Sequence, residues 1–117
     1  MAASTNSSAA VQEEVANVIL SFIEVATHSL LFYRGLYPPS VFEKRKEYGL
    51  ACWMSRHPAL NASIADSLAA AKPHLLRGTI ESIVIVITER GRAIEQYSFD
   101  VRGDAAAAAI GVPATYR

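Results

Sequence analysis

Along residues 14–33, polar residues recur every three or four positions, and so do apolar residues, which is the spacing of an α-helix. The polar positions define one face: Glu14, Asn17, Ser21, Glu24 and His28. The apolar positions define the opposite face: Val15, Val18, Ile19, Phe22, Ile23, Ala26, Leu30 and Tyr33. Glu24 argues against a membrane span, because a charge at the bilayer centre costs roughly 3 kcal/mol. The pattern predicts a long amphipathic helix of a soluble core that ends at Gly35, and the small polar residues 1–10 are expected to form a disordered tail.

A second helix is expected from Pro58, since proline suits the first position of a helix. The apolar stripe that supports it recurs every three or four residues, at Leu60, Ile64, Leu68, Ala71 and Leu75. Pro73 falls inside this pattern and is expected to kink the last turns or end them early, because it lacks a backbone donor. Gly78 closes the helix.

Extended structure is predicted in two places. Residues 41–54 are aromatic and β-branched with a break at Gly49, which indicates two short extended pieces or an irregular edge. Residues 80–88 are almost entirely β-branched and apolar on both faces, so they predict a central strand. A polar turn containing Gly91 then leads to a stretch in which Tyr97, Phe99 and Val101 alternate with polar residues. The second region therefore predicts an antiparallel hairpin from Ile80 to Val101.

This order of elements predicts an α+β domain over residues 11–102, with two helices packed on a small antiparallel sheet and a low-complexity tail at 103–117. A chain of 117 residues, 51% hydrophobic and with zero formal net charge, belongs to the soluble globular class. Zero net charge gives no global field toward nucleic acid or anionic membrane, so neither is an expected partner. The single cysteine, Cys52, excludes an intramolecular disulfide and fits a reducing compartment.

The sequence offers little catalytic chemistry. His28, His57 and His74 lack the spacing of metal ligands; His28 is expected on the polar helix face and His57 beside a helix N-cap. Phosphate-binding and nucleophile motifs are absent from the sequence, and Cys52 lies in an apolar run without an adjacent charge. A buried small thiol is the favoured interpretation of Cys52, with a cysteine-dependent enzyme as the alternative. We therefore expect no enzyme, no catalytic residue, no metal and no cofactor.

One stretch, YPPSVFEKRKEYGLACWMSRHPAL, has an order that no packing rule requires. Its residues resemble a pattern in the HORMA-domain accessory subunits of translesion DNA polymerase zeta. That family has YP, an aliphatic residue and F, then KRK and Y, and later MS-x-HP-x-LN. The matching positions are Tyr37, Pro38, Val41, Phe42, Lys44, Arg45, Lys46, Tyr48, Met54, Ser55, His57, Pro58, Leu60 and Asn61.

The resemblance implies a non-enzymatic HORMA adaptor that acts in translesion synthesis, DNA repair and the cell cycle. Its implied partners are the catalytic subunit of DNA polymerase zeta and other damage-tolerance proteins, in the nucleus and possibly the cytoplasm. The chain resembles only the N-terminal half of such proteins, so we expect the third core helix and the peptide-enclosing safety belt to be missing. Two alternatives stay open: a spindle-assembly-checkpoint HORMA protein, which shares YP-x-x-x-F, YGL and a hairpin ending in FD, and a fragment without a stable function.

The resemblance also assigns candidate sites. Tyr37 matches a partner-peptide position, although a packed corner residue explains it equally well, and Ser63 stands where the family has an aromatic that contacts the peptide. Lys44 matches a lysine of the HORMA self-association surface, whereas Gly35 replaces a glutamate of that surface. The residues alone offer two further interpretations of the Lys44, Arg45 and Lys46 cluster: nucleic-acid binding, or a solvated edge whose field Glu43 and Glu47 halve.

Overall fold

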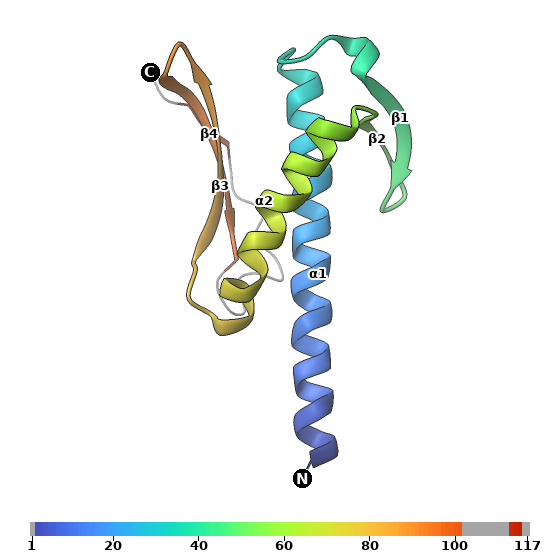
Figure 1. Cartoon of the computed structure of the whole chain (residues 1–117), viewed down its shortest axis with the longest axis vertical. Coiled ribbons are helices and arrows are strands. Elements are labelled where there is room, and N and C mark those ends of the chain that lie inside the picture. The colour runs from blue at the N-terminus through green and yellow to red at the C-terminus, as the bar shows by residue number, and fades with distance from the viewer. Residues whose placement is uncertain (1, 102–112, 116–117) are drawn as a thin grey trace. The chain divides into compact units, whose positions relative to one another are not determined.

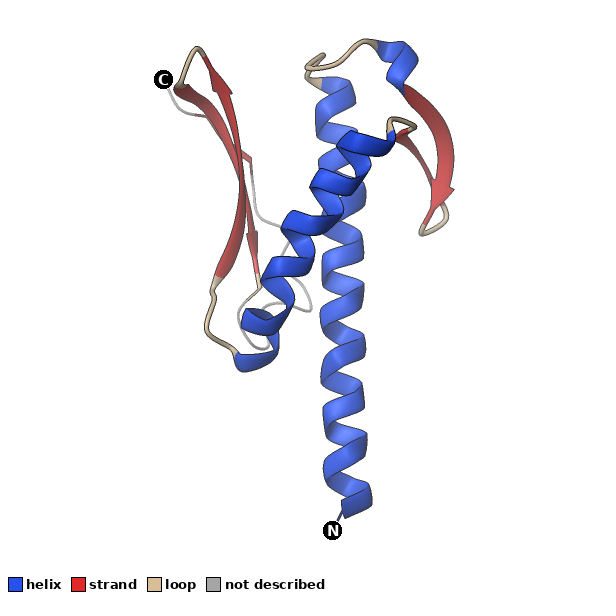
Figure 2. Ribbon diagram, in the orientation of Figure 1, coloured by secondary structure: helices blue, strands red, loops and turns tan. Residues whose placement is uncertain are grey.

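The computed structural model describes residues 2–101 and 113–115. The chain forms two compact units, Met1–Lys72 and Pro73–Arg117. Five elements begin in the first unit: α1 (Ala2–Tyr33), the 3-10 turn η1 (Pro39–Val41), β1 (Phe42–Glu47), β2 (Leu50–Ser55) and α2 (Pro58–Arg77) (Figure 1). The second unit contains β3 (Ser82–Glu89), β4 (Arg92–Asp100) and β5 (Pro113–Thr115), which are drawn as strands in Figure 2.

Both helices end as the sequence predicted. Gly35 and Gly78 follow the last turns of α1 and α2 with φ of 64° and 67°. At the end of α1, the Leu36 amide donates to the Leu31 carbonyl and the Gly35 amide to the Phe32 carbonyl, both at 3.1 Å. This pair of bonds is a Schellman motif, which glycine favours because it adopts a left-handed backbone without steric cost.

The beginning of α1 differs from the sequence prediction. The helix starts at Ala2, whereas residues 1–10 were expected to be a disordered tail. Four of the nine residues from Ala2 to Ala10 are alanine, the residue with the highest helix propensity. A helix that already exists extends readily, since each added residue gains one backbone hydrogen bond without a new nucleation step.

The buried face of α1 is rotated relative to the predicted one. Ala16, Leu20 and Ile23 are buried, and so is His28, which the pattern assigned to the polar face. Val15, Val18 and Tyr33 were assigned to the core but are 49%, 55% and 70% exposed. The predicted faces are therefore partly wrong, because α1 has apolar residues on more than one side and its period fits more than one orientation.

By length and composition, α1 could also cross a membrane. The segment Ala9–Tyr33 has a mean hydropathy of 1.6, and 22% of its most apolar window is buried. Core helices of soluble proteins and N-terminal signal sequences have the same properties. This feature therefore assigns no location by itself.

The predicted break at Gly49 is a hairpin turn. β1 and β2 pair antiparallel from Phe42 opposite Ser55 to Glu47 opposite Leu50. Tyr48 and Gly49 connect them with φ of 52° and 75°, and two consecutive positive values are typical of a type I′ turn. The two short extended pieces expected in this region are confirmed, and their hairpin curves beside the C-terminal part of α1 (Figure 1).

The apolar stripe of α2 is confirmed. Ile64 is buried, and the other predicted positions, Leu60, Leu68, Ala71 and Leu75, are half-buried. Pro73 lies inside the helix, which continues for another turn to Arg77. Of the two effects expected of Pro73, the early end of the helix is therefore wrong, since one missing donor near a helix end removes only one of its backbone bonds. A kink of the last turns stays a prediction.

The predicted hairpin from Ile80 to Val101 is confirmed as β3 and β4, joined by a turn in which Arg90 and Gly91 have positive φ. A register shift after Ile87 places Ala93 opposite Thr88 and leaves Ile94 as the extra residue of a β-bulge. Phe99 and Val101 are buried as expected.

The sheet has a third strand that the sequence pattern did not reveal. β5 pairs with β4 from Glu95 opposite Thr115 to Tyr97 opposite Pro113, so the order is β3-β4-β5. In this described sheet β4 is central and β3 lies at the edge, where Val84 and Val86 are 41% and 47% exposed. The prediction of β3 as the central strand is wrong, because β-branched residues favour strands whether or not both faces are covered. β5 lies in the range predicted as a low-complexity tail, most of which is outside the described residues.

Candidate functional site: a helix-capping junction and a basic hairpin

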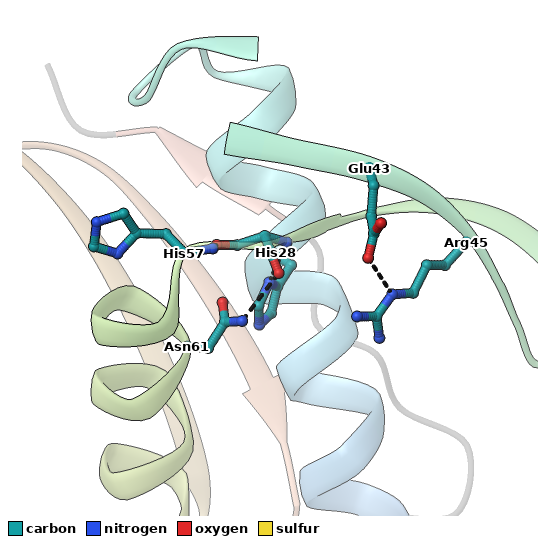
Figure 3. A network of polar contacts seen from close by, with 6 residues as sticks. His28, Glu43, Arg45, His57 and Asn61 are labelled. Atoms are coloured by element: carbon teal, nitrogen blue, oxygen red, sulfur yellow. Dashed lines mark hydrogen bonds and ion pairs between the residues drawn. The ribbon is translucent and has the colours of Figure 1, made fainter. Parts of the chain in front are cut away.

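Ser55, at the end of β2, joins three elements of the first unit. It is 1% exposed, and its backbone amide donates to Nδ1 of His28 on α1 at 2.9 Å. Its carbonyl accepts from Nδ2 of Asn61 on α2 at 3.0 Å. Figure 3 shows His28 and Asn61 side by side at this junction. The side chains of α1 and α2 thus satisfy backbone groups of β2 that are buried away from water.

His57 caps the start of α2. Its Nδ1 accepts from the Leu60 amide at 3.2 Å, and its carbonyl accepts from the Asn61 amide at 2.9 Å. The His57 amide in turn donates to Oγ of Ser55 at 3.0 Å. His57 is therefore the N-cap itself rather than its neighbour, and Pro58 takes the first helical position. The MS-x-HP-x-LN string has a structural role in this chain: it forms a strand-to-helix joint.

His28 acts in this joint as a neutral ring. Because its Nδ1 accepts a hydrogen bond, the proton of the neutral imidazole is assigned to Nε2. Burial lowers the pKa of His28 below its ordinary value of 6.5. The carboxylate of Glu24 acts in the opposite direction and raises this pKa, whereas the positive charge of Arg45 lowers it further. The sequence pattern placed His28 on the polar face of the helix. No local pattern in the sequence indicates that its Nδ1 is buried and accepts a hydrogen bond.

Aromatic contacts hold the β1–β2 hairpin against α1. The ring of Phe32 stacks on Trp53 at 4.3 Å between centroids, and Phe42 meets Phe32 edge-on at 5.4 Å. At the turn, the ring of Tyr48 lies 5.7 Å from Phe22, and its hydroxyl donates to Oγ of Ser21 at 2.8 Å. Phe42 and Tyr48, two of the residues that carry the family resemblance, therefore fix the hairpin.

The strand alternation separates the charges of β1. Lys44 lies opposite Trp53, and its ammonium is 6.0 Å from the centre of the indole ring. Arg45 points to the other face and pairs with Glu43 at 3.1 Å (Figure 3). Lys44, Arg45 and Lys46 are all exposed. The sequence interpretation, in which Glu43 and Glu47 halve the field of all three basic residues, did not take into account that the strand places Lys44 and Arg45 on different faces.

Tyr37 and Ser63 lie on different elements. Tyr37 follows α1 and is 40% exposed, while Ser63 is exposed in the second turn of α2, where its carbonyl accepts from Oγ of Ser67 at 2.9 Å. Among the described residues, no hydrogen bond or ring contact joins the two. Their peptide-binding roles and the self-association role of Lys44 stay predictions.

The structure shows little further chemistry in the residues it describes. Cys52 is half-buried opposite Arg45, and its interpretation as a buried small thiol stays a prediction. No three metal-ligating side chains come together within residues 2–101 and 113–115. An open groove of about 270 Å³ between α1 and α2 is lined by apolar residues such as Leu20 and Leu68 and by the charged residues Glu24 and Lys72. Lys72 pairs with Glu13 of α1 at 3.2 Å.

Comparison with known proteins gives the class to which this geometry belongs. The HORMA domain family model matches residues 15–113, and the chain therefore belongs to the HORMA domain family. Two α-helices with small antiparallel sheets give it an incomplete α+β HORMA-like fold. The described residues contain neither a third long helix nor a safety belt, the two features that the family resemblance led us to look for.

The relatives refine this assignment. The chain is 41% identical over 88 residues to the mitotic spindle assembly checkpoint protein MAD2B of Homo sapiens and of Bos taurus, covering 74% of this chain and 42% of each relative. It is 28% identical over 99 residues to the MAD2A protein of Mus musculus, covering 83% of this chain and 48% of that protein. A chain in the crystal structure of the mitotic checkpoint complex matches with a TM-score of 0.70 and 26% identity, over 76% of this chain and 48% of that one. This chain spans less than half the length of these relatives.

Proposed function

We propose that this chain is a non-enzymatic HORMA adaptor of the polymerase-zeta type, which binds extended segments of partner proteins in translesion synthesis and DNA repair. The observation that carries the proposal is the 41% identity to MAD2B proteins, the type to which the resemblance assigns the polymerase-zeta accessory subunit, against 28% to a MAD2A protein. The residues that carry the family resemblance support the same assignment, since the KRK and MS-x-HP-x-LN strings favour the accessory subunit of polymerase zeta. The adaptor acts in the nucleus, with the cytoplasm as a second location, and makes no direct contact with nucleic acid or membrane.

The proposed partners are the catalytic subunit of DNA polymerase zeta and other damage-tolerance proteins. Tyr37 contributes an exposed aromatic ring to the peptide contact. Ser63 offers only a small side chain, so that part of the contact is weaker than in the family pattern. Self-association through Lys44 is a further part of the proposal, although Gly35 removes one charge that the family places on this surface.

A spindle-checkpoint role is the second candidate. The names of the MAD2B and MAD2A relatives refer to the mitotic spindle assembly checkpoint, and the structural neighbour belongs to the mitotic checkpoint complex. Competition between peptides from a polymerase-zeta catalytic subunit and from a checkpoint partner would distinguish the two candidates, because the preferred peptide identifies the branch.

The experiment that tests the adaptor proposal is a calorimetric titration of the chain with an extended peptide from a polymerase-zeta catalytic subunit. We expect measurable binding that Tyr37→Ala weakens by about fivefold or more, which corresponds to about 1 kcal/mol. Tyr33→Ala is the matched control, since Tyr33 is also an exposed tyrosine near the end of α1. Equal losses in the two variants, or no heat with the unaltered chain at millimolar peptide, would contradict the proposal.

A further inference from the structure

The β1–β2 hairpin presents a cationic face that the sequence does not show. Residues directly opposite each other in an antiparallel pair lie on the same face of the sheet. Lys44 and Lys46 therefore share one face with their partners Trp53 and Ala51. The acidic side chains of β1 lie on the opposite face, where Glu43 pairs with Arg45. Phe42 and Trp53 on this face pack on Phe32 of α1. Beside them, the face keeps the two exposed ammonium groups of Lys44 and Lys46 without an intervening carboxylate from either strand.

Trp53 restricts the position of Lys44 on this face. The Lys44 ammonium lies 6.0 Å from the indole centre, within the range of a cation–π interaction. Stacking with Phe32 at 4.3 Å fixes the indole in turn. A charged side chain that is partly ordered before binding loses less conformational entropy when it meets a partner.

We propose that this face and the adjoining edge of β1 bind an extended acidic segment of a partner protein. In the described two-stranded sheet, β1 pairs with β2 on one side, so the backbone groups of its other edge point away from β2. A strand added there places alternate side chains opposite Lys44 and Lys46, about 6.6 to 6.8 Å apart on both chains. Carboxylates at alternate positions match this spacing.

The charge distribution favours an acidic peptide over nucleic acid. The formal net charge of the chain is zero and its pI is about 6.8. Two lysines neutralise only about two phosphates, which gives weak attraction and a shallow salt dependence. An extended peptide instead gains main-chain hydrogen bonds in addition to its charge pairs.

The test uses the intrinsic fluorescence of Trp53, the only tryptophan of the chain. The probe is a short synthetic peptide of alternating glutamate and threonine, and the control peptide replaces each glutamate by glutamine. We expect the glutamate peptide to change the emission and to bind at least about threefold more tightly. Lys44→Ala and Lys46→Ala should each weaken its affinity about threefold to fivefold, as expected for lost cross-strand charge pairs.

Arg45→Ala is the matched control variant, because it removes the same charge from the opposite face. Circular dichroism of each variant establishes that it is folded. If Lys44→Ala does not fold, the affinity of Lys46→Ala alone tests the proposal. Equal loss in Arg45→Ala, or no preference for the glutamate peptide, would overturn the proposal and leave the lysines as protection of an open strand edge. Tighter lysine-dependent binding of a single-stranded oligonucleotide would overturn it in favour of nucleic acid. A dimer that Lys44→Ala dissociates, without binding of the glutamate peptide, would overturn it and leave Lys44 only the self-association role of the proposed function.

Discussion

At the scale of single residues, the neutral imidazole of His28 connects α1 to the end of β2. Its pKa is lowered in the folded chain, so the unfolded chain takes up the proton first as pH falls below 6.5. The free energy of unfolding is therefore fully retained above about pH 6.5 and decreases as pH falls toward the folded pKa. Urea denaturation between pH 7.5 and 5 measures this decrease.

The contribution of His28 can be separated from that of other groups. His28→Asn should remove the part of the pH dependence that arises between pH 6.5 and the folded pKa. His74→Asn is the matched control, because it makes the same substitution at an exposed histidine of α2. If both variants retain the same dependence as the unaltered chain, His28 does not carry it.

Core packing along α1 gives a second residue-scale prediction. Ile23 is 2% exposed, whereas Val18 on the same helix is 55% exposed. Ile23→Ala should lower the free energy of unfolding by about 2 to 5 kcal/mol, because it removes buried methylene groups and leaves a cavity. Val18→Ala should change it by no more than about 0.5 kcal/mol. Thermal melts followed by circular dichroism measure both, and equal melting temperatures would contradict the observed face.

These residue-scale features lie at the limit of what the sequence could predict. The apolar period of α1 established that a helix exists, but its surplus of apolar residues left two orientations possible. The burial of His28 depends on the Ser55 amide, which is 27 residues away in the sequence. A contact between residues so far apart follows from tertiary packing and leaves no local pattern.

At the scale of elements, both hairpins turn through two residues of positive φ. In the β3–β4 turn these are Arg90 and Gly91, with φ of 51° and 78°. Asparagine tolerates this conformation better than arginine, so Arg90→Asn should stabilise the chain by a few tenths of a kcal/mol. Gly91→Ala should destabilise it by about 1 kcal/mol, because a Cβ is strained there. Opposite shifts of the denaturation midpoint are expected, and shifts of the same sign would argue against this turn geometry.

Element types and ends were largely predictable from the sequence. Gly35, Gly49, Gly78 and Gly91 have local roles, since each satisfies a backbone requirement at its own position. The sheet order was not predictable in the same way. The β-branched composition of β3 is compatible with an edge or a central strand, and β5 pairs with β4 across residues that carry no strand pattern.

At the scale of the whole molecule, the chain is a HORMA domain protein that spans less than half the length of the relatives it matches. Peptide capture in this family, as the resemblance implies, combines strand addition at a sheet edge with enclosure by the safety belt. The described residues offer sheet edges but no such enclosing segment. A bound peptide should therefore make fewer contacts and dissociate faster, since affinity differences between related complexes lie mostly in the dissociation rate.

The most direct test of peptide binding by this HORMA domain is surface plasmon resonance with one immobilised polymerase-zeta peptide. This chain and the whole human MAD2B protein are compared under identical conditions. We expect both to bind, with an association rate for this chain within about tenfold of that of MAD2B and a dissociation rate at least about a hundredfold faster. Equal dissociation rates would show that the residues of this chain form the whole binding site, and a complete lack of binding would contradict its proposed role as a peptide-binding HORMA adaptor.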